Sequence, residues 1–270
     1  MNESQSGASH VNDAPPFDLV YEDKVLLLFN KPSGLLSVPG KGPEKADCLR
    51  TRVQQVYPEA LTVHRLDMST SGLLLMARNA EIHRTLSIAF ANREVHKRYV
   101  AVVDGIVASD NSDANAEDVQ SWRLIDLPIA TDWVNRPLMK IDKHDGKPSQ
   151  THYRVIKHDK AMDCTHLELA PVTGRTHQLR LHLQAIGHSI LGDHLYATAA
   201  SASQITAIDV ACQSAELMHP VTGRQMDWFL TDPFVNQSGR LVKMDFSLNM
   251  MNFRYSESLK LKRSNIREIT

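Results

Sequence analysis

Between His64 and Asn79 the chain reads HRLDMSTSGLLLMARN. The stretch has two halves, a polar turn at residues 67–72 and a continuous apolar run at 73–77. A short apolar run bounded by turn residues is typical of a buried strand. We therefore predict a loop that carries Arg65 and Asp67 and leads directly into a strand of the core.

Strand and helix patterns alternate irregularly on both sides of this stretch. Apolar periodicity predicts extended structure with a turn over 18–31, a strand over 97–105, and a hairpin of strands over 150–159 and 163–172. It predicts helices within 79–95, after a capping Asn79, and within 175–188, where Gly187 follows the helix. Because the regular strand–helix alternation of a doubly wound sheet is missing, we predict an α+β fold. Its sheet is expected to be mixed and largely antiparallel, with flanking helices and loops around a central cleft.

Length and charge exclude several classes of protein. The chain has 270 residues, 42% hydrophobic and 23% charged, which is enough to bury a sizeable core. Its 30 Lys and Arg nearly balance 31 Asp and Glu, unlike a polybasic nucleic-acid coat or an acidic disordered chain. The sequence contains neither an apolar stretch of membrane-spanning length nor a secretory signal pattern, so we expect a cytoplasmic protein with no membrane partner. The three cysteines are expected to be buried, unpaired thiols.

Composition divides the chain into three parts. Residues 1–17 are rich in small and polar side chains, and we expect this segment to be disordered. Residues 18–235 are expected to form the folded domain, with an acidic surface loop at 109–118. Residues 236–270 form a mildly basic extension, for which the sequence predicts no role.

Two polar clusters are candidates for a functional site. The loop around Asp67 is open to a purely structural interpretation, in which the carboxylate caps backbone N–H groups of its own turn. The second cluster, GRTHQLRLHL at 174–183, places His177 and Arg180 on a helix that also has an apolar packing stripe. An arginine that is half buried beside such a stripe needs a carboxylate partner. The second cluster therefore favours a functional site over a simple turn.

These clusters belong to a wider resemblance. The sequence resembles the RluA-type RNA pseudouridine synthases in four motifs that occur in the family's order: NKPSGLLSVPG at 30–40, HRLDMSTSGLLLMARN at 64–79, KRYVAVV at 97–103 and PVTGRTHQLRLHLQAIGHSILGDHLY at 171–196. Four ordered motifs over about residues 18–235 are a specific signal. TDWVNRP at 131–137, followed by HDGKPSQTHYRV, is similar more narrowly to members that modify both large-subunit rRNA and tRNA.

The resemblance implies a pseudouridine synthase fold and an isomerase that converts uridine in RNA to pseudouridine by base flipping. It implies that Asp67 is the catalytic carboxylate, that Tyr99 stacks on the target base and relays a proton, and that Arg180 holds Asp67 ionised. The chemistry agrees, because the N1–C1′ bond must break and a carboxylate at the sugar can act as nucleophile or as base. A neighbouring guanidinium would lower the pKa of that carboxylate and orient it.

The resemblance also implies a set of residues that bind the substrate. Arg65 would enter the space that the flipped uridine leaves, which offsets part of the lost stacking. Leu181 would be an apolar wall of the base pocket, although a helix leucine is more often plain core. The substrate-binding candidates are Arg65, His64, Leu181, Arg175, His177, Asn135 and Arg136.

The expected partner is an RNA stem-loop, in 23S rRNA, in the anticodon stem of tRNA, or in both, and not DNA. Basic residues such as Lys31 and Lys97 are candidates for contact with its phosphates. We expect a monomer. No cofactor is expected, because the isomerisation is redox-neutral and uses no group donor. No metal is expected either, because His177, His182, His188 and His194 lack the spacing of a zinc site.

Two other functions stay open at this point. The first is a non-catalytic RNA-binding or RNA-folding factor on the same scaffold, which loss of activity in Asp67→Ala would exclude. The second is a metal-dependent hydrolase that uses the histidines, which would be inhibited by chelators.

Overall fold

The computed structural model describes residues 17–108, 121–203 and 210–230. All of them belong to the first of two compact units, residues 1–239. The segment predicted to be disordered lies outside the described residues except for Phe17, and the acidic stretch at 109–118 and the extension at 236–270 lie outside them altogether. No helix in the described part of the chain is long and apolar enough to cross a membrane.

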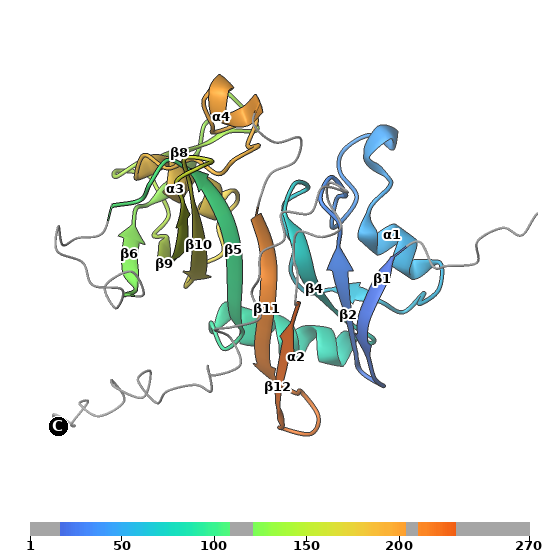
Figure 1. The fold of residues 1–270 in the computed structure, drawn as a ribbon. Coiled ribbons are helices and arrows are strands. Elements are labelled where there is room, and N and C mark those ends of the chain that lie inside the picture. The colour runs from blue at the N-terminus through green and yellow to red at the C-terminus, as the bar shows by residue number, and fades with distance from the viewer. Residues whose placement is uncertain (1–16, 109–120, 204–209, 231–270) are drawn as a thin grey trace, which may run out of the picture. The chain divides into compact units, whose positions relative to one another are not determined.

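One ten-stranded sheet organises the described residues (Figure 1). The main path is β1-β2-β4-β11-β5-β10-β9-β6, with β3 beside β4 and β12 beside β11. Every pairing is antiparallel except that of β4 with β11, so the predicted mixed, largely antiparallel sheet is confirmed. The strands are β1 (Asp18–Glu22), β2 (Leu26–Lys31), β3 (Leu61–Thr62), β4 (Ser71–Ala77), β5 (His96–Asp104), β6 (Arg123–Asp126), β9 (Gln150–Asp159), β10 (Cys164–Pro171), β11 (Val210–Met218) and β12 (Gln225–Phe229).

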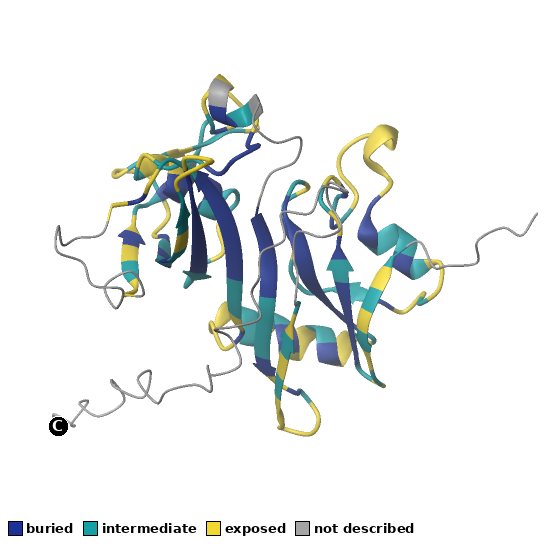
Figure 2. Ribbon diagram, viewed as in Figure 1, coloured by how far each residue is buried: buried dark blue, intermediate teal, exposed yellow. Residues whose placement is uncertain are grey.

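Strand β4 is the buried strand that the apolar run predicts. All seven of its residues are buried, and β2 and β11 flank it in the sheet (Figure 2). At its start Gly72 has a φ of 103°, and a Cβ there would overlap the backbone of Cys212 on β11. Only glycine lets these two strands approach so closely at this point, which is also where the polar loop ends.

Two helices confirm the predicted capping signals. In α2 (Ala80–Ala91) the Asn79 side chain accepts the N–H of Ile82 at 2.9 Å, and Ile82 and Leu86 are buried. Helix α3 (Gln178–Ala185) begins three residues later than the start of the predicted segment, because His177 takes a left-handed φ of 55°. Gly187 follows this helix with a φ of 87°, as expected. Shorter helices are η1 (Pro43–Lys45), α1 (Leu49–Gln54) and α4 (Ala199–Ser203).

A separate two-stranded hairpin, β7 (Ile129–Thr131) and β8 (Met139–Ile141), was not predicted. Its strands have three residues each, which is too short for an apolar period to be recognised. The hairpin has a small core of its own, in which Ile129 packs with Leu181 of α3 and with Tyr196. The three cysteines are buried and none of them forms a disulfide, as predicted.

Candidate active site

A cleft of about 760 Å³ opens where three loops meet. The loop after β2 contributes one wall, the loop that carries Asp67 contributes a second, and residues of and around α3 contribute a third. Pro137 of the β7–β8 loop also lines it. The residues of the cleft that bear charge or a titratable ring are Arg65, Asp67, His177, Arg180, Asp193 and His194.

Contacts of the backbone around Asp67, rather than contacts of its carboxylate, fix its position in this cleft. Leu66 is buried, and its backbone forms two hydrogen bonds with the Ser37 hydroxyl, which accepts the Leu66 N–H at 3.0 Å and donates to the Leu66 carbonyl at 2.7 Å. The Asp67 carbonyl accepts the N–H of Thr70, which closes the turn. The Asp67 carboxylate itself forms no hydrogen bond or ion pair with any described residue. It is therefore available to a ligand in the cleft.

Lys31 fixes the other side of the same loop. Its side chain is fully buried, and its ammonium donates to the carbonyls of Leu35 at 2.7 Å, Pro32 at 2.8 Å and Met68 at 3.1 Å. Burial lowers the pKa of Lys31 to about 7, and the negative charge of Asp67 opposes this shift. The prediction that Lys31 contacts RNA phosphates is wrong, because its three donors point to the protein's own backbone.

Arg180 forms a buried ion pair, but not with the predicted partner. Its Nε donates to Oδ2 of Asp193 at 2.7 Å, and its Nη2 donates to Oδ1 at 2.6 Å. Burial favours a neutral guanidine, but the hydrogen bonds and the charge of Asp193 outweigh it and raise the pKa of Arg180. The predicted direct pairing of Arg180 with Asp67 is corrected: Asp193 occupies the guanidinium fork, and Asp67 acts on Arg180 as a nearby charge in the same cleft.

Tyr196 joins this ion pair to His177. The Tyr196 hydroxyl accepts the N–H of Met139 at 2.8 Å and lies 2.8 Å from Nδ1 of His177. The Tyr196 hydroxyl can donate its own proton to Nδ1 of His177 in the tautomer that carries the ring proton on Nε2. Burial lowers the pKa of His177, which favours the same neutral ring, while the charge of Asp67 opposes the shift.

Asp193 and Tyr196 are the residues of this site to which the sequence assigned no role. Both lie in the GDHLY stretch at 192–196 that carries part of the resemblance, so the motif contained them without indicating what they contact. The carboxylate of Asp193 also accepts the N–H groups of Leu195 and Tyr196 at 2.9 and 3.2 Å. The same side chain therefore orients Arg180 and shapes the turn that carries Tyr196.

Tyr99 lies in β5, where it pairs with Leu169 of β10 and Cys212 of β11. It is 8% exposed. Burial raises the pKa of Tyr99 well above its usual range, and the Cys212 thiol and Asp67 raise it further. The ring is therefore a neutral phenol that is close enough to Asp67 to feel its charge.

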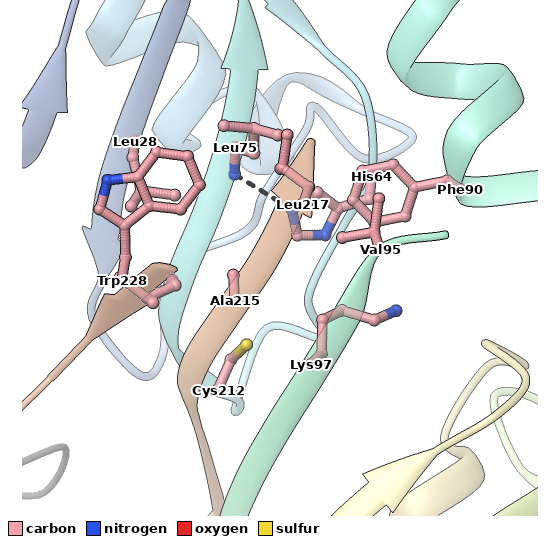
Figure 3. Close-up of a pocket in the computed structure, with 11 residues that line it drawn as sticks. Leu28, His64, Leu75, Phe90, Val95, Lys97, Cys212, Ala215, Leu217 and Trp228 are labelled. Carbon is pink, nitrogen blue, oxygen red and sulfur yellow. Dashed lines mark hydrogen bonds between the residues drawn. The ribbon is translucent and has the colours of Figure 1, made fainter. Parts of the chain in front are cut away.

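His64 lies outside the cleft. Its Nε2 accepts the N–H of Leu75 at 3.0 Å, and its ring stacks on Phe90 with 4.7 Å between centroids (Figure 3). Burial lowers the pKa of His64 to about 3, so the ring is neutral. The structure thus places His64 in a small cavity at the back of the loop, where it ties that loop to β4, and the prediction that it binds substrate is wrong.

Lys97 lines the same small cavity, with its ammonium 5.4 Å from the centre of the Phe90 ring (Figure 3). Burial lowers the pKa of Lys97. The expectation that it contacts phosphates is therefore not supported by its surroundings.

The other predicted binding residues fall into two groups. Arg65 is exposed and lines the cleft beside Asp67, whereas Leu181 is buried in the small core under the β7–β8 hairpin and does not line the cleft. The structure thus places Leu181 as support for Tyr196 rather than as a wall of the pocket. Arg175 is exposed outside the cleft, and Asn135 and Arg136 lie at the exposed tip of the β7–β8 hairpin.

Three of the four histidines of the metal hypothesis have other partners, and the first of them, His177, contacts the Tyr196 hydroxyl. His182 contacts the Thr151 hydroxyl and the Leu127 carbonyl, and His188 contacts the Asp104 carbonyl. The only group of three or more metal-type donors found among the described residues is Asp159, Cys164 and His166, at the end of the β9–β10 hairpin. It includes none of the histidines that motivated the hypothesis.

Comparison with known proteins identifies the family. A sequence model described as RNA pseudouridylate synthase matches residues 25–185. The chain is 43% identical to the dual-specificity RNA pseudouridine synthase RluA of Yersinia pestis over 208 residues, which cover 77% of this chain and 95% of that one. It is 41% identical to the protein of that name from Escherichia coli (strain K12), over 77% of this chain and 90% of that one.

A solved structure supports the fold as well. The human RNA pseudouridylate synthase domain containing 1 superposes with a TM-score of 0.65 at 26% identity, covering 82% of this chain and 85% of that one. On this family match and these relatives, together with the four ordered motifs, the mixed sheet and the cleft that contains Asp67, the chain belongs to the RNA pseudouridylate synthase family and isomerises uridine to pseudouridine in RNA.

Proposed function

We propose that this enzyme modifies two classes of RNA, a hairpin uridine of 23S rRNA and an anticodon-loop uridine of tRNA. The proposal rests on the two relatives named above, whose names state dual specificity. The TDWVNRP stretch supports it further, because it builds a hairpin whose Pro137 reaches the cleft. In both substrates an unpaired loop would let the target base swing out.

The observation that carries the proposal is the Asp67 carboxylate, which lines the cleft and forms no hydrogen bond or ion pair with a described residue. Isomerisation breaks the N1–C1′ bond, rotates the freed uracil and joins C5 to C1′, after which the C5 proton is lost and N1 gains one. Asp67 serves either as nucleophile at C1′ or as base at the sugar, and both roles require the ionised carboxylate. Asp67 also lies close enough to Lys31 and Arg180 for its charge to act on both of them.

The surrounding residues then have distinct tasks. Tyr99 is not among the residues that line the cleft, but its buried phenol stays protonated and lies within range of the Asp67 charge, so we give it the stacking and proton-transfer roles that the family resemblance implies. Arg65 is exposed at the rim of the cleft and would occupy the gap left in the RNA stack. The Arg180–Asp193 pair and Tyr196 hold the floor of the cleft rigid, so that little reorganisation is needed when RNA binds.

The proposal extends to the state of the enzyme in the cell. It works as a monomer, needs neither a metal nor a cofactor, and acts in the cytoplasm, where both classes of RNA are found. Size-exclusion chromatography with light scattering tests the first point. Activity after exhaustive treatment with a chelator tests the second.

Pseudouridine mapping of RNA from cells with and without the gene tests the substrates. Cells are complemented with the wild type or with Asp67→Asn, which keeps the shape of the side chain but not its charge. We expect one anticodon-loop uridine and one 23S rRNA hairpin uridine to lose the modification, and only the wild type to restore both. If a different uridine responds, the dual-substrate proposal fails while the reaction stands. If Asp67→Asn restores both sites, the role given to Asp67 fails.

A further inference from the structure

The tip of the β7–β8 hairpin exposes apolar surface that the fold does not use. Val134 is 90% exposed and Trp133 is 72% exposed, more than any other large hydrophobic residue in the described part of the chain. The guanidinium carbon of Arg136 lies over the Trp133 ring, 3.7 Å from its centre, so the two side chains form a cation–π platform. An indole presented to solvent in this way is typical of a binding surface.

The platform is held in shape before any ligand arrives. The Asp132 carboxylate accepts the N–H groups of Val134 and Asn135, both at 3.2 Å, and the Asn135 side-chain amide at 2.9 Å. The hairpin closes below it, where the Leu138 carbonyl accepts the Asp132 N–H. A rigid loop loses little entropy when its side chains bind, which favours affinity.

The hairpin is also fixed relative to the cleft. Its Met139 N–H bonds the same Tyr196 hydroxyl that contacts His177, and the Arg180 guanidinium carbon lies 5.1 Å from the Tyr196 ring centre. Pro137, one residue beyond Arg136, lines the cleft. The platform therefore stands at the rim of the cleft that contains Asp67, and a molecule bound at Asp67 extends toward it.

We propose that Trp133, backed by Arg136, stacks on a second unpaired base of the RNA loop, next to the target uridine. The inference rests on the proposed function and adds a recognition site to it. A nucleobase fits because it is flat and apolar on its faces, so that indole and guanidinium can both stack with it. Arg65, the exposed cation of the cleft, suits the phosphates that connect such a base to the target.

The proposal predicts a loss of RNA affinity without a loss of chemistry. Stacking on an aromatic ring contributes enough per base that Trp133→Ala should raise KM by about 5- to 100-fold at an unchanged kcat. Trp133→Phe should recover part of this loss. Val134→Ser, in the same loop and even more exposed, is the matched control and should keep the KM of the wild type. The probe is an unmodified RNA hairpin with the sequence of a tRNA anticodon stem-loop.

A binding measurement provides a readout that does not depend on turnover. In an Asp67→Asn background, the hairpin should quench the tryptophan fluorescence of the protein, and adding Trp133→Phe should abolish most of that quenching. An unchanged KM for Trp133→Ala together with unchanged quenching in Trp133→Phe would overturn the proposal. So would a loss confined to kcat, because stacking at the rim acts on binding. If the wild type forms no pseudouridine in this hairpin but does so in others, the substrate proposal fails and the same comparison is made with a hairpin that reacts.

Discussion

Replacing Asp193 by asparagine tests whether the cleft depends on its buried ion pair. The side chains of Arg180 and Asp193 are 7% and 0% exposed, and two short hydrogen bonds join them. Asparagine keeps the volume and one acceptor oxygen but removes the charge, so the guanidinium stays buried without a counterion. Breaking such a pair costs about 3–5 kcal/mol. At about 2–4 °C per kcal/mol for a domain of this size, Tm should fall by about 6–20 °C.

The assay is urea unfolding of the wild type, Asp193→Asn, Arg180→Met and the double variant. The double variant should lose less than the sum of the two single variants, because it leaves no unpaired buried charge. Asp47→Asn is the matched control, since it breaks an Arg–Asp pair whose side chains are 34% and 63% exposed and should change stability far less.

Activity of the same variants connects this pair to catalysis. In Asp193→Asn the freed guanidinium can turn toward Asp67, the next carboxylate in the cleft, so we expect kcat to fall even where the protein remains folded. If Asp193→Asn costs under about 1 kcal/mol, or if the two single losses simply add, the ion pair is not the support that its burial indicates.

Three further predictions address the loop around the cleft. Burial lowers the pKa of Lys31 to about 7, so the unfolded chain binds the Lys31 proton more tightly than the folded protein does. The protonated ammonium therefore destabilises the fold. This destabilisation is absent above the unfolded pKa of about 10.5 and complete below about pH 7. The free energy of unfolding of the wild type should therefore rise by a few kcal/mol between about pH 7 and 10, relative to that of Lys31→Met. Urea unfolding of both proteins across this pH range tests this, and a difference between them that does not change with pH would contradict it. His64→Ala leaves the Leu75 N–H unpaired and should lower the free energy of unfolding by about 1–3 kcal/mol. It should also lower kcat while RNA affinity is kept, and an unchanged kcat would mean that the ring only fills space. Gly72→Ala should cost about 3 kcal/mol or more in thermal unfolding, whereas Gly223→Ala, also at positive φ but in open space, should cost only about 1–2 kcal/mol.

The features that were predicted correctly from the sequence depend on residues close together in the chain. Asn79 starts a helix because its own side chain can accept the N–H of Ile82, three positions along. The run at 73–77 forms a buried strand because no polar side chain interrupts it. Such effects act over a few residues, so they can be recognised before any fold is known.

The residues that the sequence misplaced are those whose partners lie far along the chain. Lys31 is basic, and basic residues are normally exposed, yet Met68, 37 positions away, provides one of its three acceptors. His64 is polar and adjacent to the catalytic loop, yet β4 and α2 enclose it. Composition alone favours solvent for both, and only the packing around them reverses that preference.

Ordered motifs and apolar periods lie in neighbouring residues, so the family, the α+β class and the position of Asp67 in a loop before a core strand could all be predicted without a structure. Three features became visible only in the folded chain: Asp193 pairs with the guanidinium of Arg180, Tyr196 links His177 to the β7–β8 hairpin, and Trp133 stands at the rim of the cleft. A buried charge takes the partner whose geometry satisfies its hydrogen bonds best, and that choice depends on how distant segments pack.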